Sequence, residues 1–147
     1  MIRYEGMQQA HVAQIAALEK ECFSDPWSIA SITSELTNPL SLWLVAVDDD
    51  RVVGYVGSQS VLDGADVMNL AVSAQYRRQG VGERLMQLLE DKLKEKGVCM
   101  LALEVRVSNA AAISLYEKLG FYQAGRRPRY YTNPKEDAFI LRKEWHV

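Results

Sequence analysis

The spacing of apolar residues changes abruptly at Tyr76, and this change constrains the fold more than any other feature of the chain. Before it, Leu42–Val47, Val52–Leu62 and about Asp66–Val72 are short segments rich in valine. The connections between them are equally short, with Asp63–Gly64 as one of the turns. Short β-branched segments with such connections predict three consecutive strands in an antiparallel meander.

After Tyr76 the apolar residues recur at helical spacing, which predicts a long helix that starts near Val81 and ends at Gly97. Its apolar stripe consists of Val81, Leu85, Leu88, Leu89 and Leu93. The remaining elements alternate in type and are, in order, a strand at Val98–Val107, a helix at Asn109–Leu119, a strand at about Phe121–Arg127, a loop at Tyr130–Glu136 and a strand at about Ala138–Lys143.

Two helices are expected ahead of the first strand. Apolar residues at helical spacing mark Gln8–Cys22, and a shorter helix at Trp27–Leu36 has Ser24 or Asp25 as its expected cap. The full order predicts an α/β fold with a mixed, mainly antiparallel sheet and helices on both faces. No repeat or low-complexity linker interrupts the chain, so residues 1–147 are expected to form a single domain.

The composition argues against several classes of protein. Seventeen basic and nineteen acidic residues give a net charge of −2, so direct nucleic-acid binding by a globally basic surface is not expected. No metal site is expected, because Cys22, Cys99, His11 and His146 do not occur at ligand spacing. No stretch reaches membrane-spanning length and no signal-peptide core is present, which favours a cytoplasmic protein with reduced thiols and no membrane association.

The segment Arg77–Arg78–Gln79–Gly80–Val81–Gly82 is suited to bind an anion. Gly80 and Gly82 let the backbone approach a ligand closely, and the start of the helix presents unpaired N–H groups at the positive end of its dipole. The two arginines add positive charge. The segment matches neither the Walker A pattern nor GxGxxG. A plain strand–helix turn with surface arginines is the alternative.

In its strand–helix setting, Arg77-x-x-Gly80-x-Gly82 matches the [Q/R]xxGx[G/A] signature of the GNAT acetyltransferases. The chain resembles that family over essentially its whole length and is closest to the RimI-like branch, the ribosomal-protein alanine N-acetyltransferases. Five further motifs carry the narrower resemblance, namely Phe23–Ser28, Leu103–Arg106, Ser108–Ile113, Leu115–Phe121 and the Arg127-x-x-Tyr130–Tyr131 stretch.

This resemblance implies the GNAT acyl-CoA N-acyltransferase fold, with acetyl-CoA as co-substrate. The pyrophosphate would bind the glycine-containing turn, and backbone groups of the preceding strand would pair with the pantetheine arm, one N–H pointing at the thioester carbonyl. Asn109 would add a hydrogen bond to CoA, although its sequence position also suits a helix cap, for which Ser108 competes. The expected acetyl-CoA-binding residues are Leu70, Ala71, Val72, Arg77, Arg78, Gln79, Gly80, Val81, Gly82, Glu83 and Asn109.

Acetyl transfer to an amine requires a base, and Glu104 is the candidate. It interrupts the apolar series Leu101, Leu103 and Val105 and falls on the opposite face of the strand, where an unpaired carboxylate is costly. The alternative is a structural ion pair with Arg106 or with a basic residue of the last strands. The resemblance favours the base, because RimI-like enzymes place their proton acceptor at this glutamate.

Tyr116 is the candidate acid that protonates the departing thiolate. It shares a helix face with Ala112, Leu115 and Leu119, and an aromatic residue at that spacing is usually a core residue. A tyrosine hydroxyl can nevertheless reach a cleft while its ring packs. The resemblance assigns the acid role, since the family has this tyrosine beside the sulfur of CoA.

The segment Arg126–Tyr131 is basic and aromatic, and such a segment can hold a peptide backbone or acidic side chains. A solvated loop is the alternative. The family usually has asparagine where this chain has Arg129, which bears on acceptor preference and leaves the core chemistry untouched. Trp27 is expected either on the opposite wall of the acceptor groove or as an anchor in the core, the latter being favoured.

We therefore expect an enzyme, an acetyl-CoA-dependent N-acetyltransferase acting on the N-terminal amine of a protein. The acceptor that the branch implies is the N-terminal alanine of protein eighteen of the small ribosomal subunit. Direct transfer is expected, because Cys99 has no activating neighbour in sequence. Alternatives are other protein N-termini, lysines or a small amine, and a non-catalytic acetyl-CoA-binding domain, which would need neither Glu104 nor Tyr116. A monomer is the default expectation.

Overall fold

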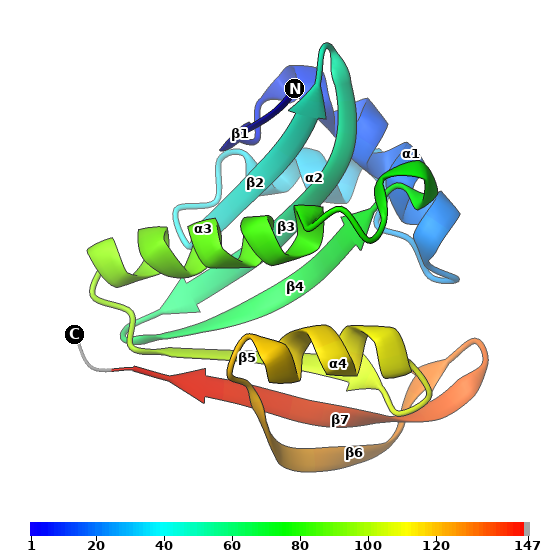
Figure 1. Cartoon of the computed structure of the whole chain (residues 1–147), viewed down its shortest axis with the longest axis vertical. Helices are drawn as coiled ribbons and strands as arrows, with labels where there is room; N and C mark the ends of the chain where they lie inside the picture. The colour runs from blue at the N-terminus through cyan, green and yellow to red at the C-terminus, as the bar shows by residue number, and fades with distance from the viewer. Residues whose placement is uncertain (146–147) are drawn as a thin grey trace.

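The computed structural model describes residues 1–145 and contains a seven-stranded sheet in the order β1-β2-β3-β4-β5-β7-β6 (Figure 1). The strands are β1 (Ile2–Gly6), β2 (Ser41–Asp48), β3 (Arg51–Val61), β4 (Gly64–Val72), β5 (Met100–Arg106), β6 (Tyr122–Thr132) and β7 (Lys135–Glu144). The helices are α1 (Val12–Cys22), α2 (Ile29–Glu35), α3 (Val81–Glu95) and α4 (Ala110–Lys118), with short 3-10 turns η1 (Gln9–His11) and η2 (Ala74–Tyr76). The β4–β5 pair is parallel and the other described pairs are antiparallel, which confirms the mixed, mainly antiparallel sheet.

Strand β1 is absent from the predicted order, which begins with a helix. It pairs with β2 in antiparallel register, from Ile2 opposite Asp48 to Gly6 opposite Leu44. Five residues carry too short a pattern to identify a strand, and the partner that makes them one lies far along the chain. The sheet is therefore one strand wider than the sequence pattern indicates.

The cap of α2 also differs from the prediction. The side chain of Ser28 accepts a hydrogen bond from the backbone N–H of Ser31 at 3.0 Å, so Ser28 is the N-cap rather than Ser24 or Asp25. The earlier residues remain in the connection between α1 and α2. This connection, residues 23–28, forms part of the site described below.

The predicted loop at 130–136 is in fact the tip of a hairpin. Strands β6 and β7 extend through most of it, with Tyr131 opposite Glu136 and Thr132 opposite Lys135. The register shifts between Arg127 and Tyr131, which bends β6 near the tip. The segment is polar around Asn133–Pro134, a dipeptide typical of turns, so its sequence resembles a loop.

The sheet is split between β4 and β5. These strands pair only through residues 64–66 and 100–102, and beyond that point the ladder ends. From there on, β4 continues to pair with β3, and β5 continues to pair with β7. The two strands diverge in the view of Figure 1, so a gap opens in the middle of the sheet.

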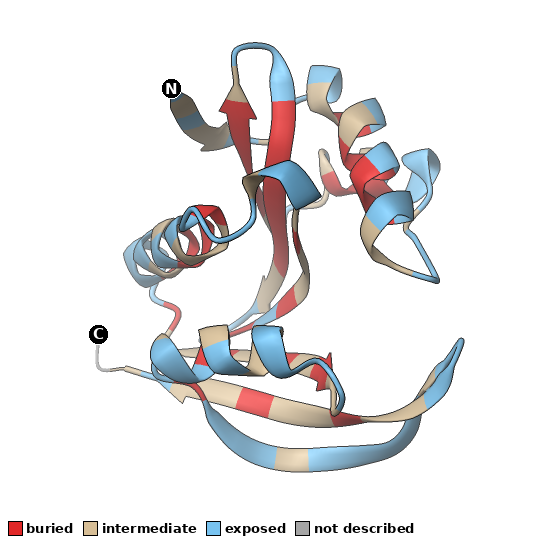
Figure 2. Ribbon diagram, turned by 45° about the vertical axis from the view of Figure 1, so that its right-hand side comes forward, coloured by how far each residue is buried: buried red, intermediate tan, exposed pale blue. Residues whose placement is uncertain are grey.

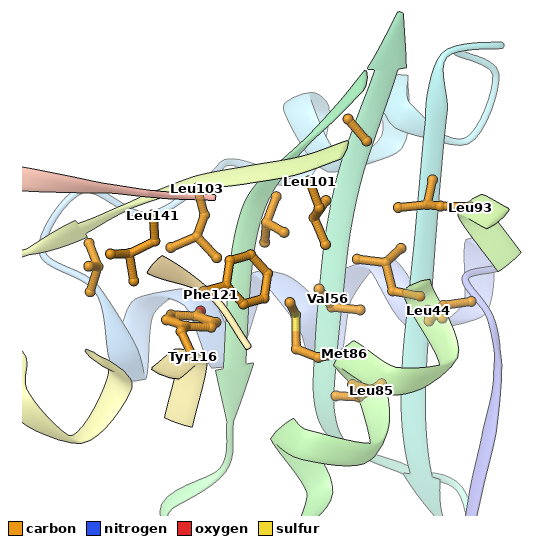
Figure 3. Close-up of a cluster of buried hydrophobic side chains, with 14 of the residues drawn as sticks. Leu44, Val56, Leu85, Met86, Leu93, Leu101, Leu103, Tyr116, Phe121 and Leu141 are labelled. Carbon is orange, nitrogen blue, oxygen red and sulfur yellow. The ribbon is translucent and has the colours of Figure 1, made fainter. Parts of the chain in front are cut away.

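Helices α3 and α4 cover one face of this divided sheet. Val81, Leu85, Leu89 and Leu93 of α3 are at most 2% exposed, which confirms four of the five predicted stripe positions. Leu88 is only partly buried, and Met86 is buried beside them. Figure 3 shows their cluster continuing through Leu101 and Leu103 of β5 to Tyr116 of α4 and to Phe121. One continuous core therefore joins the two halves of the sheet on this face. The residues of this cluster that Figure 3 labels are Leu44, Val56, Leu85, Met86, Leu93, Leu101, Leu103, Tyr116, Phe121 and Leu141.

Helices α1 and α2 cover the opposite face, where Figure 2 shows their buried sides turned toward β2 and β3. Trp43 is central there, stacked on Tyr55 with ring centres 5.6 Å apart. Gly57 is required beneath it, because a Cβ at that position would lie 2.4 Å from the Trp43 ring. The predicted helices on both faces are confirmed. No helix among residues 1–145 is long and apolar enough to span a membrane.

Candidate active site

A cavity of about 600 Å³ lies where β4 and β5 separate. One wall is the α1–α2 connection and another is the tip of the β6–β7 hairpin. The other walls are β4, β5 and the start of α4. Of the predicted site residues, the cavity is lined by Leu70, Glu104, Asn109 and Tyr116.

The glycine-containing turn lies at the end of β4, outside the lining of this cavity. Gly80 is the N-cap of α3 with φ of +78°, a left-handed conformation that favours glycine. No atom lies within 4 Å of the position that a Cβ of Gly80 would occupy. The N–H groups of the first turn of α3 have no partner within the helix, so this turn has the geometry that the anion-binding prediction requires.

Side chains next to Gly80 hold this turn in place. Nε of Arg77 donates to the carbonyl of Val72 at 3.2 Å, which ties the turn to the end of β4. Gln79 donates to the carbonyl of Gln75 at 3.2 Å. Arg78 has φ of +64° and is exposed, and no ion pair with it occurs among the described residues.

The backbone of β4 has free groups beside the gap. The N–H of Ser73 donates to Val53 of β3, so the carbonyl in the same peptide unit, that of Val72, points the other way. Because backbone groups alternate along a strand, Leu70 also faces the gap, whereas Ala71 pairs with β3. Backbone contacts with a ligand are therefore available at Leu70 and at the N–H of Val72, because the Val72 carbonyl already accepts from Arg77. They are not available at all three predicted residues.

Glu104 lies on β5 with its side chain 30% exposed. Buried Leu103 and Val105 flank it and face the α4 side, so the carboxylate faces the opposite side of the sheet, as predicted. Nε of Arg127 lies 3.3 Å from Oε1 in an ion pair, and the hydroxyl of Tyr130 approaches Oε2 at 3.4 Å. The ion pair with a basic residue of the last strands is thus present, and the pairing partner is not Arg106.

Tyr116 approaches the same cavity from α4, on the other face of the sheet. It is 7% exposed, and its ring meets that of Phe121 edge to face with centres 5.6 Å apart. Burial raises the pKa of Tyr116 far above its usual value, and nearby Tyr131 raises it further. The hydroxyl therefore keeps its proton throughout the neutral range. Both expected properties, core packing and access to the cleft, occur together in this residue.

Asn109 and Glu83 each have a structural task. The side-chain oxygen of Asn109 accepts from the N–H of Ala112 at 3.1 Å, so Asn109 rather than Ser108 caps α4. Its amide nitrogen remains for a ligand. The carboxylate of Glu83 accepts from Lys118 at 3.0 Å, which ties α3 to α4. Any contact of Glu83 with CoA is consequently left to its backbone N–H.

The segment Arg126–Tyr131 makes defined contacts with β7, unlike a solvated loop. Asp137 accepts from Arg126 Nε and from the backbone N–H of Arg129, both at 2.8 Å, and Arg129 has φ of +53°. These two basic residues are held outside the cavity lining, whereas Tyr130 and Tyr131 line it. The tyrosine pair is therefore the part of this segment that can contact a molecule in the cavity.

Glu19 of α1 is a buried carboxylate that the sequence pattern does not identify. It is 0% exposed, and its oxygens accept from the N–H of Trp27 at 2.8 Å and from the side chain of Asn69 at 2.9 Å. Burial raises the pKa of Glu19, and these two hydrogen bonds oppose that effect in part. Glu19 thereby fastens the α1–α2 connection to β4. In sequence it resembles a solvent-facing residue of an amphipathic helix.

Trp27 combines the two roles that were weighed for it. Its ring meets Trp43 edge to face, with centres 5.3 Å apart, and it also lines the cavity. Cys22 lines the cavity as well, with its Sγ accepting from Arg77 at 3.6 Å. Burial raises the pKa of the Cys22 thiol, so the thiol is not activated as a nucleophile.

These observations together describe a passage through the sheet with different groups at each side. A turn suited to phosphates and the protonated hydroxyl of Tyr116 lie on the α3–α4 side. A carboxylate and two tyrosines lie on the side of α1 and α2. Such a site can bring an acyl donor and an amine together from opposite faces and move one proton at each.

Comparison with known proteins agrees with this description. The model of the acetyltransferase (GNAT) family matches residues 12–121. The [ribosomal protein bS18]-alanine N-acetyltransferase of Escherichia coli K12 is 40% identical over 126 residues, which cover 84% of this chain and 84% of that protein.

Two solved structures share the fold over nearly the whole chain. The crystal structure of the ribosomal-protein-S18-alanine N-acetyltransferase from Escherichia coli has a TM-score of 0.91 and 35% identity, covering 100% of this chain and 96% of that one. The NatC complex bound to Gag peptide and CoA contains a chain with a TM-score of 0.87 and 28% identity, with 99% of each chain covered. The family match and the relatives, in agreement with the split sheet and the glycine-containing turn before α3, show that this chain belongs to the GNAT family of acetyltransferases.

Proposed function

We propose that this enzyme transfers the acetyl group of acetyl-CoA to the N-terminal α-amine of a protein, with the N-terminal alanine of ribosomal protein bS18 as acceptor. The observation that carries the proposal is the cavity in the split sheet, which Glu104 and Tyr116 enter from opposite faces. The bS18-alanine acetyltransferases among the relatives support the acceptor. A ribosomal acceptor also favours the cytoplasm as the place of action.

Acetyl-CoA would bind on the α3–α4 side. Its pyrophosphate would accept hydrogen bonds from the first turn of α3, with Arg77 and Arg78 adjacent. The pantetheine arm would pair with backbone groups of Leu70 and Val72, and the amide nitrogen of Asn109 would donate to it. This arrangement leads the thioester into the gap between β4 and β5. The CoA bound in the related NatC complex supports the choice of ligand.

The acceptor would enter at the other side of the sheet. We use "acceptor end" for the part of the cavity bounded by the α1–α2 connection, Glu104 and the tip of the β6–β7 hairpin. The acceptor chain would lie in this space between the two walls, where Tyr130 and Tyr131 offer hydroxyls for its backbone. A terminal amine placed there lies next to a carboxylate that can take its proton.

The chemical step is direct transfer. Glu104 removes a proton from the ammonium group of the acceptor, and the neutral nitrogen attacks the thioester carbon. The new C–N bond forms as the C–S bond breaks, and the thiolate leaves with the proton of the Tyr116 hydroxyl. The second proton that the nitrogen loses as the amide forms restores this hydroxyl, and Glu104 passes the first proton to water. The thiol of Cys22 has a raised pKa, so an acyl-cysteine intermediate is not part of the proposal.

The test uses purified protein, acetyl-CoA and a panel of acceptors, with release of the CoA thiol as the readout. The panel contains a hexapeptide with the N-terminal sequence of bS18, the same peptide with its α-amine blocked and one lysine added, and a polyamine. Turnover on the free α-amine with little on the others is expected. Turnover confined to the polyamine or to lysine would contradict the acceptor, and acetyl-CoA binding without turnover would favour a binding domain.

A further inference from the structure

Arg106 holds the tip of the β6–β7 hairpin on β5. It lies two residues beyond Glu104 on the same face of the strand, and its side chain is 23% exposed. Nη1 donates to the carbonyl of Pro134 at 2.9 Å and to Oε1 of Glu136 at 3.3 Å. Nη2 donates to the carbonyl of Asn133 at 3.2 Å. Both carbonyls of the hairpin tip are therefore fixed by one guanidinium group.

The same group reaches the opposite wall of the acceptor end. Nη2 of Arg106 approaches Oγ of Ser24 at 3.5 Å, and the Ser24 hydroxyl donates to the carbonyl of Asn133. Ser24 belongs to the α1–α2 connection, which is far from the hairpin in sequence. Two walls that share no strand or helix thus meet at the guanidinium of Arg106.

Arg106 also supports the tyrosine pair. Its guanidinium carbon lies 4.3 Å from the centre of the Tyr131 ring, a cation–π contact. Tyr131 in turn meets Tyr130 edge to face at 5.0 Å, and the hydroxyl of Tyr130 approaches Glu104 at 3.4 Å. The carboxylate of Glu104 has its own partner in Arg127. Loss of Arg106 would therefore disturb the tyrosines and leave the base in place.

We propose that Arg106 is a positioning residue for the protein acceptor, setting the separation of the two walls and the orientation of the Tyr130–Tyr131 pair between which the acceptor chain lies. The proposal rests on the proposed function and assigns Arg106 no part in the chemical step. A planar guanidinium is required, because it binds several acceptors along its edge while its face stacks on a ring. A lysine ammonium at this position cannot do both.

The test compares Arg106→Lys with the wild-type enzyme on two acceptors, the bS18 hexapeptide and alaninamide, a short acceptor that reaches the base and little of the walls. We expect the KM for the hexapeptide to rise about tenfold or more, the loss of hydrogen bonds to a charged group being of that size. The KM for acetyl-CoA and the kcat should stay within about twofold, and alaninamide should be used as before.

Arg51→Lys is the matched control, because Arg51 also lies over a tyrosine ring, that of Tyr76 at 5.9 Å, and does not line the cavity. It should leave both KM values unchanged. Ser24→Ala is a second variant, in which Arg106 is unchanged and only its contact with the Ser24 hydroxyl is lost. It should also raise the hexapeptide KM, by a smaller factor. Melting curves of all variants identify any general loss of folding.

Equal losses on hexapeptide and alaninamide, or an unchanged hexapeptide KM in both Arg106→Lys and Ser24→Ala, would overturn the positioning role. A fall in kcat with unchanged KM would do the same, since it would place Arg106 in the chemical step. Wild-type enzyme without turnover on the hexapeptide would remove the proposed function and this inference with it. The two failures are therefore distinguished by the wild-type measurement alone.

Discussion

At the scale of single residues, the two proposed catalytic groups differ in how the protein surrounds them. Glu104 is part-exposed and lies beside a cation and a hydroxyl. Tyr116 is almost fully buried, and its raised pKa keeps the hydroxyl protonated. A carboxylate open to the acceptor can take a proton and pass it to water, whereas a sheltered phenol retains the proton that a leaving thiolate needs.

Glu104→Gln is expected to lower kcat on the bS18 hexapeptide by about 100-fold or more, the usual contribution of a general base. Acetyl-CoA affinity, measured by calorimetry, should not change. Arg127→Gln separates this role from the structural alternative, because it removes the ion pair and keeps the carboxylate. If Arg127→Gln lost as much activity as Glu104→Gln, the ion pair would explain the effect and the base assignment would fail.

Tyr116→Phe should also lower kcat by about 100-fold while the protein keeps its melting temperature, since the ring and its contact with Phe121 remain. Because the pKa of Tyr116 is raised, the kcat of the wild-type enzyme should show no decline from this group between pH 7 and about pH 10, its ordinary pKa. Tyr122→Phe, at an exposed tyrosine, is the control. A Tyr116→Phe enzyme with normal kcat would exclude the acid role.

The roles of single residues differ in how well they can be predicted from the sequence. Glu104 is identifiable because strict alternation in β5 places it opposite Leu103 and Val105. The carboxylate of Glu19 is not, because its burial depends on Trp27 and Asn69, which approach it from other elements. The apolar periodicity of a helix predicts which face of that helix is buried. It does not predict which residues of other elements pack over the end of the helix.

At the scale of elements, the turn before α3 requires a left-handed backbone conformation at Gly80, and the space around that residue is open. The left-handed φ of Gly80 is needed to start the helix at Val81, directly after the arginine pair. The sequence predicted this element well, because a glycine next to a long amphipathic stripe has few other interpretations. Strand β1 and the β6–β7 hairpin were missed or shortened, because their pairing partners and not their own patterns make them strands.

Gly80→Ala should lower the free energy of unfolding by about 1 kcal/mol, the cost of a left-handed conformation for a residue with a Cβ. No steric clash adds to this, since space is open around that position. Gly80→Asn should cost less, because asparagine adopts this conformation more readily. Urea unfolding measures both variants, and equal losses for alanine and asparagine would show that φ is not the origin of the effect. Acetyl-CoA affinity should follow the same order.

At the scale of the whole molecule, the mixed sheet with helices on both faces was predictable and the split in it was not. The split follows from where a parallel ladder ends, at residues 66 and 102, and no pattern in either strand marks that point. Stability in this arrangement depends on contacts that cross between elements, of which Glu19 is the most buried charged example.

Glu19→Gln tests that contact through the pH dependence of unfolding. Because burial raises the pKa of Glu19 in the folded protein, its favourable contribution is complete below the unfolded pKa of about 4.3 and is lost as pH rises through the folded pKa. The free energy of unfolding of the wild type should therefore fall relative to Glu19→Gln as pH rises from about 4 toward neutrality. Glutamine keeps both hydrogen bonds if the amide of Asn69 reverses.

Urea unfolding at a series of pH values measures this difference. Glu5→Gln, a substitution of the same kind on β1, serves as the control for changes in surface charge. A difference between wild type and Glu19→Gln that is constant with pH, or that grows in favour of the wild type, would show that burial does not dominate the titration of Glu19.

The short ladder between β4 and β5 also has a consequence for how this enzyme can diverge. The groups proposed to bind the donor come from α3, α4 and β4, whereas the walls of the acceptor end come from the α1–α2 connection and the β6–β7 hairpin. Substitutions in those two connecting segments can alter acceptor choice without touching the residues that bind the donor. A new specificity can therefore arise by small steps, each of which keeps a working acetyltransferase.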